Sequence, residues 1–508
     1  MKVFIGIDIG TSSVKIIAIS DSLELLGEAS FNYPTYYPGP LSTEQDPDDW
    51  WLATKQALTT LINECKIPVK SIQAFGLTGQ MHSLVAIDRF NQVIRKAILW
   101  NDQRSDRQTQ VITQLAKSPA NLIDMVANRS ITGFTLSKLL WLKDNEPSNY
   151  AKINKILLAK DEIRRRLTGS NATDVSDASG TLLFDVAKRQ WSLPMLELMQ
   201  IDPNILPEAF ESTQITGYIT KSTSTEIGLD LTGIPVIAGA GDCIAAAVGL
   251  GITKQGVLGV SLGTSGILMA NANQCLIDYD GRLHSFCHGL PDKWHLMGVN
   301  LTGGGALKWF KDAFYSQDDN FYENLNLSFK RERLQNKPQP FFLPYLSGER
   351  TPHFDANATG CFIGLKPEHN HQNLAYAVME GVAFNLRQSL EIMHALHIPV
   401  DTIKVTGGGA RNQAWLNILS DILGCNLIRL KSEQGPALGV SLLAGLATGD
   451  FKDIDQCQAD FNNSTDEVEF NEANRQYYNK AYSVYRQLYD DLSDSFNKIA
   501  NLYIHTIN

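Results

Sequence analysis

Two glycine-rich segments of this sequence, residues 6–12 and 259–265, resemble each other. They read Gly-Ile-Asp-Ile-Gly-Thr-Ser and Gly-Val-Ser-Leu-Gly-Thr-Ser, and a second apolar run follows each of them. Apolar runs on both sides of a glycine turn predict a β-hairpin, and a plain hairpin is the simpler interpretation of either copy alone. Such a turn also offers N–H and O–H donors to phosphate. Because the turn occurs twice, we expect two related lobes that hold a nucleotide between them.

The two segments differ at one position with chemical consequences, which is Asp8 in the first and Ser261 in the second. A carboxylate beside a phosphate-binding turn repels the phosphates unless a cation lies between them. Mg²⁺ binds one or two carboxylates together with phosphate oxygens and waters. We therefore expect Asp8 to be the acid on the metal side, bound to Mg²⁺ through a water molecule.

A second candidate acid, Asp242, lies between glycines and a run of small residues in segment 239–247. An aspartate that only caps a helix is an equally good interpretation of the local sequence. An unpaired carboxylate is costly to bury, so we expect this one to face a cleft near a helix N-terminus. Its place shortly before the second phosphate turn predicts a general base, which accepts the proton of a substrate hydroxyl as the hydroxyl oxygen attacks the γ-phosphate.

Two polar segments each follow a predicted strand in the first half of the chain. Residues 79–83 (Gly-Gln-Met-His-Ser) follow a strand at 72–77, and residues 100–104 (Trp-Asn-Asp-Gln-Arg) follow one at 93–99. Any one of these side chains is most simply explained by a structural hydrogen bond. Together they offer the converging donors and acceptors that a small polyhydroxylated substrate needs.

Two more glycine clusters, residues 303–309 and 406–412, each precede a helical pattern. A tight turn into a helix is the simpler interpretation of each cluster alone. A helix N-terminus also presents N–H groups to phosphate, so both clusters are candidates for the nucleotide side. The sequence contains no G-x-x-x-x-G-K-[ST] motif, and we therefore do not expect a P-loop.

Length and composition predict a folded protein of two to four domains, and we expect two large lobes. The net charge of −10 and the lack of a long basic segment argue against nucleic acid and membranes as partners. The apolar runs lack the length and composition of a membrane span, and the first residues lack a signal-peptide core, so a cytoplasmic location is expected. Seven scattered cysteines predict reduced thiols in the core.

The C-terminal region carries aromatic and aliphatic residues at spacings of three and four, which predict one apolar face of a long helix. They are Tyr478, Tyr482, Tyr485, Tyr489, Leu492 and Phe496. We expect this face to dock on the second lobe. A contact between the two copies of a homodimer is the alternative.

Together these motifs resemble those of the FGGY family of sugar kinases. The matching segments, in the order of the family, are residues 6–12, 44–47 with Trp50 and Trp51, 79–82, 100–102, 176–181, 262–266, 347–353 and 407–411. The resemblance implies an α/β fold of two actin-like, ribonuclease-H-like lobes, residues 1–250 and 251–508, with ATP and Mg²⁺ in the cleft between them. It also implies phosphorylation of the 5-hydroxyl of D-xylulose, because the kinases of that sugar are the family members that this sequence resembles most.

The resemblance gives individual residues their expected roles. Asp242 is expected to be the catalytic base and Asp8 the acid near the metal and phosphate. The residues expected to contact the sugar are Met81, His82, Trp100, Asp242 and Cys243. The residues expected on the phosphate and nucleotide side are Thr11, Ser12, Lys15, Gly263, Thr264, Gly304, Lys308, Gly408, Gly409 and Asn412.

One position departs from the family pattern, because kinases of D-xylulose resemble one another in having Asn where this chain has Cys243. A thiol is a weak donor and acceptor, so another ketose or polyol, such as ribulose, is the alternative substrate. An actin-like or chaperone-like ATPase switch is the alternative from another class, and the polar loops of the first half argue against it. A sugar-binding protein without catalysis is a third alternative, and the two phosphate hairpins argue against that one.

Overall fold

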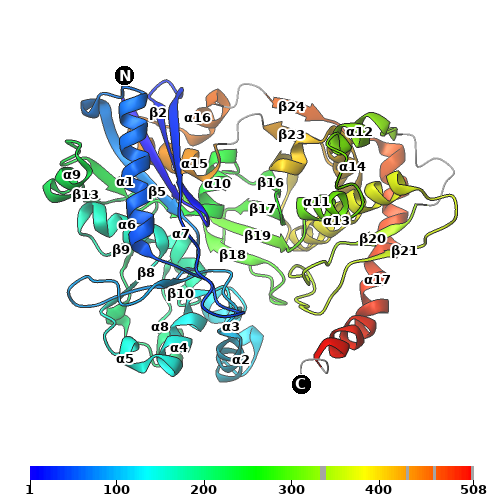
Figure 1. The fold of residues 1–508 in the computed structure, drawn as a ribbon, viewed down its shortest axis with the longest axis horizontal. Helices are drawn as coiled ribbons and strands as arrows, with labels where there is room; N and C mark the ends of the chain where they lie inside the picture. Colours follow the sequence, from blue (N-terminus) through cyan, green and yellow to red (C-terminus); the bar gives the residue numbers. More distant parts are fainter. Residues whose placement is uncertain (332–338, 431–433, 462–464, 505–508) are drawn as a thin grey trace.

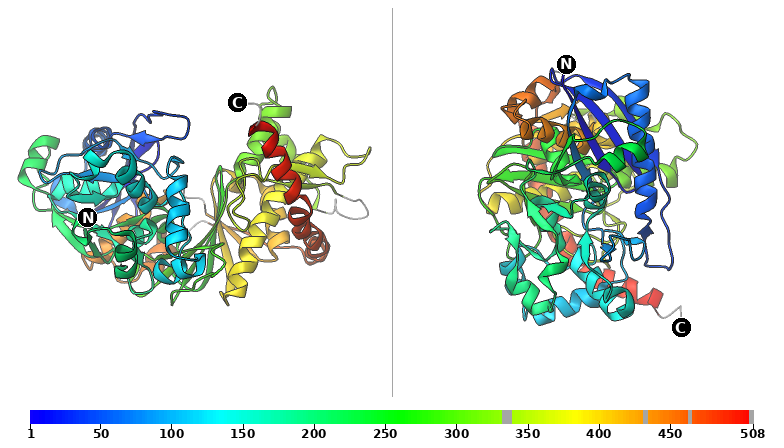
Figure 2. Two further views of the ribbon diagram at one scale, coloured as in Figure 1. Left: turned by 90° about the horizontal axis from the view of Figure 1, so that it is seen from below. Right: turned by 90° about the vertical axis from the view of Figure 1, so that its left-hand side faces the viewer.

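The computed structural model describes residues 1–331, 339–430, 434–461 and 465–504. The chain folds into two lobes that lie side by side, and each is built on a seven-stranded mixed sheet with helices packed against it (Figures 1 and 2). The predicted α/β class with two lobes is therefore confirmed.

The first sheet has the strand order β13-β14-β5-β1-β2-β3, and β15 pairs with the end of β5. These strands are β1 (Val3–Ile9), β2 (Ser13–Ser20), β3 (Leu25–Asn32), β5 (Ile72–Gly79), β13 (Ile215–Tyr218), β14 (Pro235–Ile237) and β15 (Ala240–Gly241). β1 pairs antiparallel with β2 and parallel with β5. Alternate residues of β1 face α1 (Pro47–Glu64) on one side and α15 (Gly435–Ala447) on the other, so the strand is apolar except at Asp8 near its end.

The second sheet has the order β18-β19-β17-β16-β22-β23-β24. Its strands are β16 (Gly256–Leu262), β17 (Gly266–Ala272), β18 (His284–Cys287), β19 (Trp294–Asn300), β22 (Val400–Thr406), β23 (Leu427–Leu430) and β24 (Thr465–Val468). β16 pairs antiparallel with β17 and parallel with β22, as β1 does with β2 and β5. Both predicted hairpins are thus confirmed, and they occupy the same place in the two sheets.

Helices cover the sheets and connect the strands. In the first lobe they include α2 (Asp106–Leu115), α3 (Pro119–Val126), α4 (Thr135–Asn145), α6 (Ala159–Thr168), α7 (Val175–Ala178), α8 (Leu193–Met199) and α9 (Lys221–Ile227). In the second half of the chain they include α11 (Gly304–Phe314), α12 (Phe321–Ser328), α13 (His371–Ala395), α14 (Gln413–Leu423), α16 (Ile454–Phe461) and α17 (Glu472–Ile504).

Helix α15 comes late in the sequence but packs on the first sheet, where it appears in orange beside the blue strands (Figure 1). A Cβ atom on Gly6 of β1 would lie 2.0 Å from the carbonyl oxygen of Ala437. α10 (Asp242–Leu250) crosses α15 just as closely, since a Cβ atom on Gly439 would lie 1.9 Å from the carbonyl oxygen of Ala245. Only glycine allows these contacts. α15 therefore packs closely both on the strands of the first sheet and on α10.

The strand predicted at residues 93–99 is wrong in its extent. Only β7 (Ala97–Ile98) is a strand there, and it pairs with β4 (Glu44–Gln45). Arg95 forms ion pairs with Glu44 and Glu146, and Lys96 forms one with Asp46. These two charged side chains interrupt the apolar run, and so the regular ladder begins only after them.

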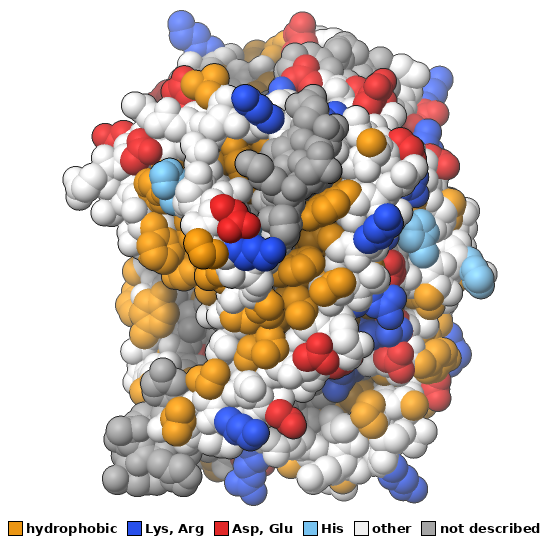
Figure 3. Space-filling model, turned by 90° about the vertical axis from the view of Figure 1, so that its right-hand side faces the viewer, with side chains coloured by type: hydrophobic (Ala, Val, Ile, Leu, Met, Phe, Trp, Pro, Cys, Tyr) orange, Lys and Arg blue, Asp and Glu red, His pale blue; other side chains and the backbone are white. Residues whose placement is uncertain are grey.

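The predicted C-terminal helix is α17, and it docks on the second lobe as expected. Tyr478, Tyr482, Tyr485 and Phe496 are buried. The hydroxyl of Tyr478 donates to Glu380 of α13 at 2.7 Å, and that of Tyr485 donates to the carbonyl oxygen of Gly381 at 3.2 Å. The homodimer contact remains a prediction. On the side of the second lobe, Lys and Arg side chains are interspersed with Asp and Glu, and hydrophobic side chains gather near the middle (Figure 3).

The seven cysteines are all free thiols. Cys287 and Cys457 are buried, Cys65 is exposed and the other four are half-buried, so the prediction of core thiols is right for two of them. Within the described ranges, none of the helices is both long enough and apolar enough to span a bilayer.

Candidate active site

The two candidate catalytic carboxylates lie at the carboxyl ends of strands in the first sheet. Asp8 is the last but one residue of β1, and Asp242 directly follows β15. Both strands pair with β5, where Asp8 and Ala240 flank Thr78 from opposite sides. Because β5 lies between them, the backbones of Asp8 and Ala240 are two strand spacings apart, which amounts to about 10 Å. The charge of Asp242 raises the pKa of Asp8, which places both carboxylates at one site.

Burial gives both carboxyl groups an unusual basicity. It raises the pKa of Asp8 to about 7, with a further contribution from the charge of Asp242 and an opposing one from Lys15. It raises the pKa of Asp242 to about 6, although the carboxylate accepts the N–H of Cys243 at 2.7 Å. A carboxylate with a pKa of about 6 is ionised at neutral pH and still accepts a proton more readily than an ordinary aspartate.

Asp242 does not cap a helix in the way that the alternative interpretation required. Gly241 occupies the N-cap of α10 without a side-chain bond, and Asp242 is the first residue of the helix. Its carboxylate therefore stands at the positive end of α10, where the peptide dipoles favour the ionised form.

Met81 and His82 lie against the segment that carries Asp242. A Cβ atom on Gly241 would be 2.8 Å from Cγ of Met81, so the two segments touch. Nδ1 of His82 is 2.7 Å from the carbonyl oxygen of Gly180, and burial, together with the charges of Lys138 and Arg350, lowers the pKa of His82 to about 3. A neutral imidazole beside a carbonyl must carry its proton on Nδ1, which leaves Nε2 as an acceptor for a ligand hydroxyl.

Trp100 contacts the glycine turn of the first hairpin. Its Nε1–H donates to Oγ1 of Thr11 at 3.0 Å, while 40% of the residue is exposed. The neighbouring Ser12 is exposed, and Lys15 lies opposite Asp8 in the hairpin and pairs with Glu28 at 3.0 Å. The structure therefore brings the first-lobe candidates Asp8, Thr11, Lys15 and Trp100 into one neighbourhood.

Three further residues hold the first phosphate turn in place. Tyr33 donates to the carbonyl oxygens of Gly10 and Ser13, and Nε2 of Gln45 donates to that of Thr11 at 2.6 Å. Gln80 donates in turn to the side-chain oxygen of Gln45 at 2.9 Å. These bonds use carbonyl oxygens of the turn and leave its N–H groups untouched. Gln45 and Gln80 lie in segments that match the family, but the sequence did not predict that they hold this turn. No sequence pattern pointed to Tyr33.

Several buried oxygen atoms around Asp8 have no hydrogen-bond partner in the described part of the chain. They are Asp8 Oδ1, Thr78 Oγ1 and Gln80 Oε1. Buried acceptors without partners are costly, so this cluster indicates that a ligand supplies donors or a cation. The free carboxylate oxygen of Asp8 therefore fits the oxygen-only coordination of Mg²⁺.

The second lobe contributes a pocket of 730 Å³ beside the second phosphate turn. All seven residues predicted on that side line it, namely Gly263, Thr264, Gly304, Lys308, Gly408, Gly409 and Asn412. α11 begins at Gly304 and α14 directly after Asn412, so two helix N-termini reach this pocket. Eight of its residues lay outside the predicted set: Leu262, Gly305, Leu307, Arg411 and Trp415, together with Tyr322, Glu323 and Asn326 from α12.

The second lobe also places the cation of Arg350 near His82. The charge of Arg350 contributes to the lowered pKa of His82 in the first lobe and to that of His284 in β18. The next residue, Thr351, is fixed to β19, because its N–H donates to the carbonyl oxygen of Val299 at 2.9 Å. The two lobes thus meet around His82.

The chain is similar to known proteins over most of its length. The models for the N-terminal and C-terminal domains of the FGGY family of carbohydrate kinases match residues 3–249 and 258–448. The chain is 36% identical to the xylulose kinase of Bacillus subtilis over 494 residues, which cover 97% of this chain and 98% of that one. It is 38% identical to the xylulose kinase of Escherichia coli, over 89% of this chain and 91% of the other. The crystal structure of a xyloylose kinase from Brucella ovis has a TM-score of 0.90 and 33% identity, and it covers 97% of this chain and 99% of its own.

Proposed function

Because this chain belongs to the FGGY family of carbohydrate kinases, as its motifs predicted, we propose that it transfers the γ-phosphoryl group of ATP to the 5-hydroxyl of D-xylulose. The proposal rests on one observation, which is that Asp8 and Asp242 lie close together beside His82, where β1 and β15 of the first sheet end. The full-length similarity to xylulose kinases supports D-xylulose as the sugar.

In this reaction Asp242 is the general base. Its carboxylate accepts the proton of the 5-hydroxyl while the hydroxyl oxygen forms a bond to the γ-phosphorus. The bond between that phosphorus and the β,γ-bridging oxygen breaks, and ADP leaves with the electron pair. The pKa of about 6 at Asp242 suits this transfer, because the group is ionised before the reaction and more basic than a solvated aspartate.

The remaining residues bind and orient the reactants. The glycine-lined pocket of the second lobe holds the nucleotide, and the turn at Thr11 receives its terminal phosphate from the other side. Asp8 is the residue that holds Mg²⁺, which supplies positive charge to the transferring phosphate when it is bound. His82 accepts a sugar hydroxyl at Nε2, and the side chain of Met81 forms an apolar wall.

Two other functions make different predictions. A kinase for another ketose or polyol is favoured by Cys243, whose thiol is half-buried directly after the base. An ATPase switch needs no sugar, and the buried carboxylate of Asp242 beside Met81 and His82 argues against it.

The direct test is an assay of ADP release with D-xylulose, D-ribulose, L-ribulose, xylitol and glycerol as acceptors. We expect the highest kcat/KM with D-xylulose. A higher value for another acceptor would show that the proposed sugar is wrong, while the proposed kinase activity would stand. ATP turnover at the full rate without any acceptor would support the switch instead.

Replacement of Cys243 by asparagine tests the sugar contact. The thiol is protonated, because burial and the neighbouring Asp242 raise its pKa well above the ordinary value. An amide at this position adds a hydrogen bond to a sugar hydroxyl, worth about 0.5 to 1.5 kcal/mol. We therefore expect Cys243→Asn to lower KM for D-xylulose by up to about tenfold, with a smaller change in kcat.

The same kinetics separate the two substrate hypotheses. If Cys243 makes room for another sugar, the asparagine raises KM for that sugar, and D-xylulose remains a poor substrate. Identical constants for both proteins on every sugar would place this residue outside the site. The matched control is Cys361→Asn, a half-buried cysteine of the second lobe that lies outside the proposed site.

A further inference from the structure

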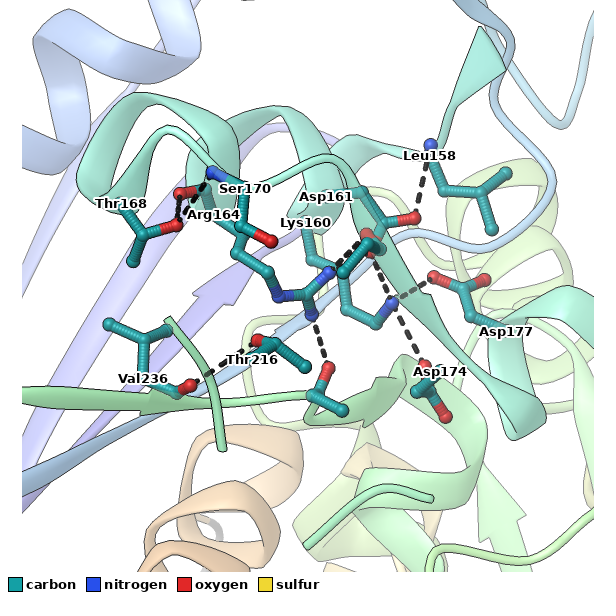
Figure 4. A network of polar contacts seen from close by, with 12 residues as sticks. Leu158, Lys160, Asp161, Arg164, Thr168, Ser170, Asp174, Asp177, Thr216 and Val236 are labelled. Carbon is teal, nitrogen blue, oxygen red and sulfur yellow. Dashed lines mark hydrogen bonds and ion pairs between the residues drawn. The ribbon is translucent and has the colours of Figure 1, made fainter. Parts of the chain in front are cut away.

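A cluster of five charged side chains is fully buried in the first lobe (Figure 4). Its members, each 0% exposed, are Lys160, Asp161, Arg164, Asp174 and Asp177. Nζ of Lys160 lies 2.8 Å from Asp161, 2.9 Å from Asp174 and 3.1 Å from Asp177. Arg164 pairs with Asp161 at 2.6 Å. The cluster thus links α6, β9 (Ala172–Asp174) and α7.

Burying such a cluster makes an unfavourable contribution to the free energy of folding. Removing charged groups from water costs several kcal/mol for each ion, and apolar residues of similar volume often stabilise a protein at least as well. Burial raises the pKa of Asp177 well above its usual range, so the fold disfavours the ionised form of this group. Stability alone therefore gives a poor account of the cluster, and its contacts with neighbouring backbone give a better one.

The cluster holds the chain just before Asp242 at two points. Arg164 donates to the carbonyl oxygen of Ala238. Oγ of Ser176 accepts the N–H of Gly241 at 3.1 Å and donates its own proton to Asp174 at 2.5 Å. Asp174 thereby orients the serine hydroxyl, so that its lone pair faces Gly241. Segment 238–241 is clamped at both ends, immediately before the proposed base.

The sugar side of the same segment is packed as well. β15 pairs with the end of β5, and Gly241 lies against Met81. Asp242 itself forms no bond with the cluster, and its altered pKa comes from burial and from hydrogen bonds of residues 242 and 243. The cluster can therefore act on the base through backbone position, with little effect on its charge.

We propose that Ser176, oriented by the Lys160–Asp174 ion pair, is a positioning residue that fixes the backbone of Gly241 and so aims the carboxylate of Asp242 at the sugar hydroxyl. This inference rests on the proposed role of Asp242 as the base. Displacing a reacting group by about 1 Å can cost about 100-fold in rate, so one hydrogen bond at Gly241 has a large effect.

The test replaces Ser176 with alanine. We expect kcat for sugar phosphorylation to fall by about ten- to a hundredfold, with KM for ATP and the slow sugar-independent ATP hydrolysis within about twofold of the wild type. Ser176→Cys keeps the size of the side chain and offers only a weak acceptor, and it should lose activity in the same way. A wild-type kcat in either variant would overturn the proposal.

Ser212→Ala is the matched control. Ser212 is buried, and its hydroxyl donates to the same Asp174 oxygen at 3.1 Å. Its contact with segment 238–241 is made by the backbone carbonyl, which the substitution keeps. We expect kcat of this variant to stay within about twofold of the wild type, although both alanine variants lose a hydrogen bond worth about 1 kcal/mol. Equal losses of kcat in the two variants would reduce Ser176 to a purely structural role.

A double substitution separates failure of this inference from failure of the proposed function. If Ser176 acts through Asp242, adding Ser176→Ala to Asp242→Asn should cause no further loss of activity. A multiplicative loss would overturn the positioning role and leave the base assignment intact. If Asp242→Asn alone retains wild-type activity, the base assignment is wrong, and the inference that depends on it is wrong too.

Discussion

Asp242→Asn is expected to lower kcat about 10²- to 10⁴-fold, because the variant lacks the group that accepts the proton of the sugar hydroxyl. The local structure should survive, since an amide oxygen can still accept the N–H of Cys243. Binding of a non-hydrolysable ATP analogue, measured by calorimetry, should change less than about twofold, because the nucleotide pocket lies on the second lobe.

The pH profile gives this prediction a second readout. Only the ionised form of Asp242 can act as a base, and its pKa is about 6. We expect kcat of the wild type to fall about tenfold for each pH unit below that value, and we expect this limb to disappear in Asp242→Asn. Asp230→Asn makes the same chemical change at an exposed position of the first lobe and should alter neither quantity. Retention of more than about a tenth of the wild-type kcat by Asp242→Asn would refute the base assignment.

The sequence allowed both hairpins to be predicted because their causes are local. Apolar residues of β1 and β2 flank a glycine turn, and the same pattern recurs in β16 and β17. One copy of the hairpin could not indicate the domain organisation. Its repetition could, since two such turns in one chain indicate two related lobes. Close packing restricts two positions of the second-lobe pocket to glycine, because a Cβ atom on Gly304 would lie 2.6 Å from the carbonyl oxygen of Gly263 and one on Gly409 would lie 2.8 Å from Cβ of Leu262.

Other parts of the site depend on contacts between segments far apart in the sequence. Nothing near Gly435 indicates that α15 crosses to the first sheet, and the contact becomes visible only where Gly6 meets Ala437. Lys160 and Arg164 have the pattern of an ordinary charged helix, yet tertiary packing buries both of them completely. The bond between Trp100 and Thr11 likewise joins two motifs that the sequence presents separately.

Asp8→Asn is expected to remove most activity and, in the absence of Mg²⁺, to stabilise the fold. The pKa of Asp8 is about 7 in the folded protein, against an ordinary value of 3.8. The folded state therefore binds the proton more tightly than the unfolded state, and stability falls as pH rises between these two values. At pH 8 the ionised carboxylate costs the fold a few kcal/mol, which the neutral amide avoids.

Thermal unfolding in EDTA measures this cost. At pH 8 we expect Tm of Asp8→Asn to exceed that of the wild type by several degrees, and near pH 4 the difference should shrink towards zero because Asp8 is then protonated in the folded protein. Added Mg²⁺ and ATP should raise Tm of the wild type more than that of the variant, and kcat/KM of the variant should be about 10²- to 10³-fold lower. The exposed Asp230→Asn change should leave Tm unaltered at both pH values. A Tm of Asp8→Asn at or below that of the wild type at pH 8 would mean that the carboxylate has a partner in the fold itself, and Asp8 would lose its assignment as the residue that holds the metal.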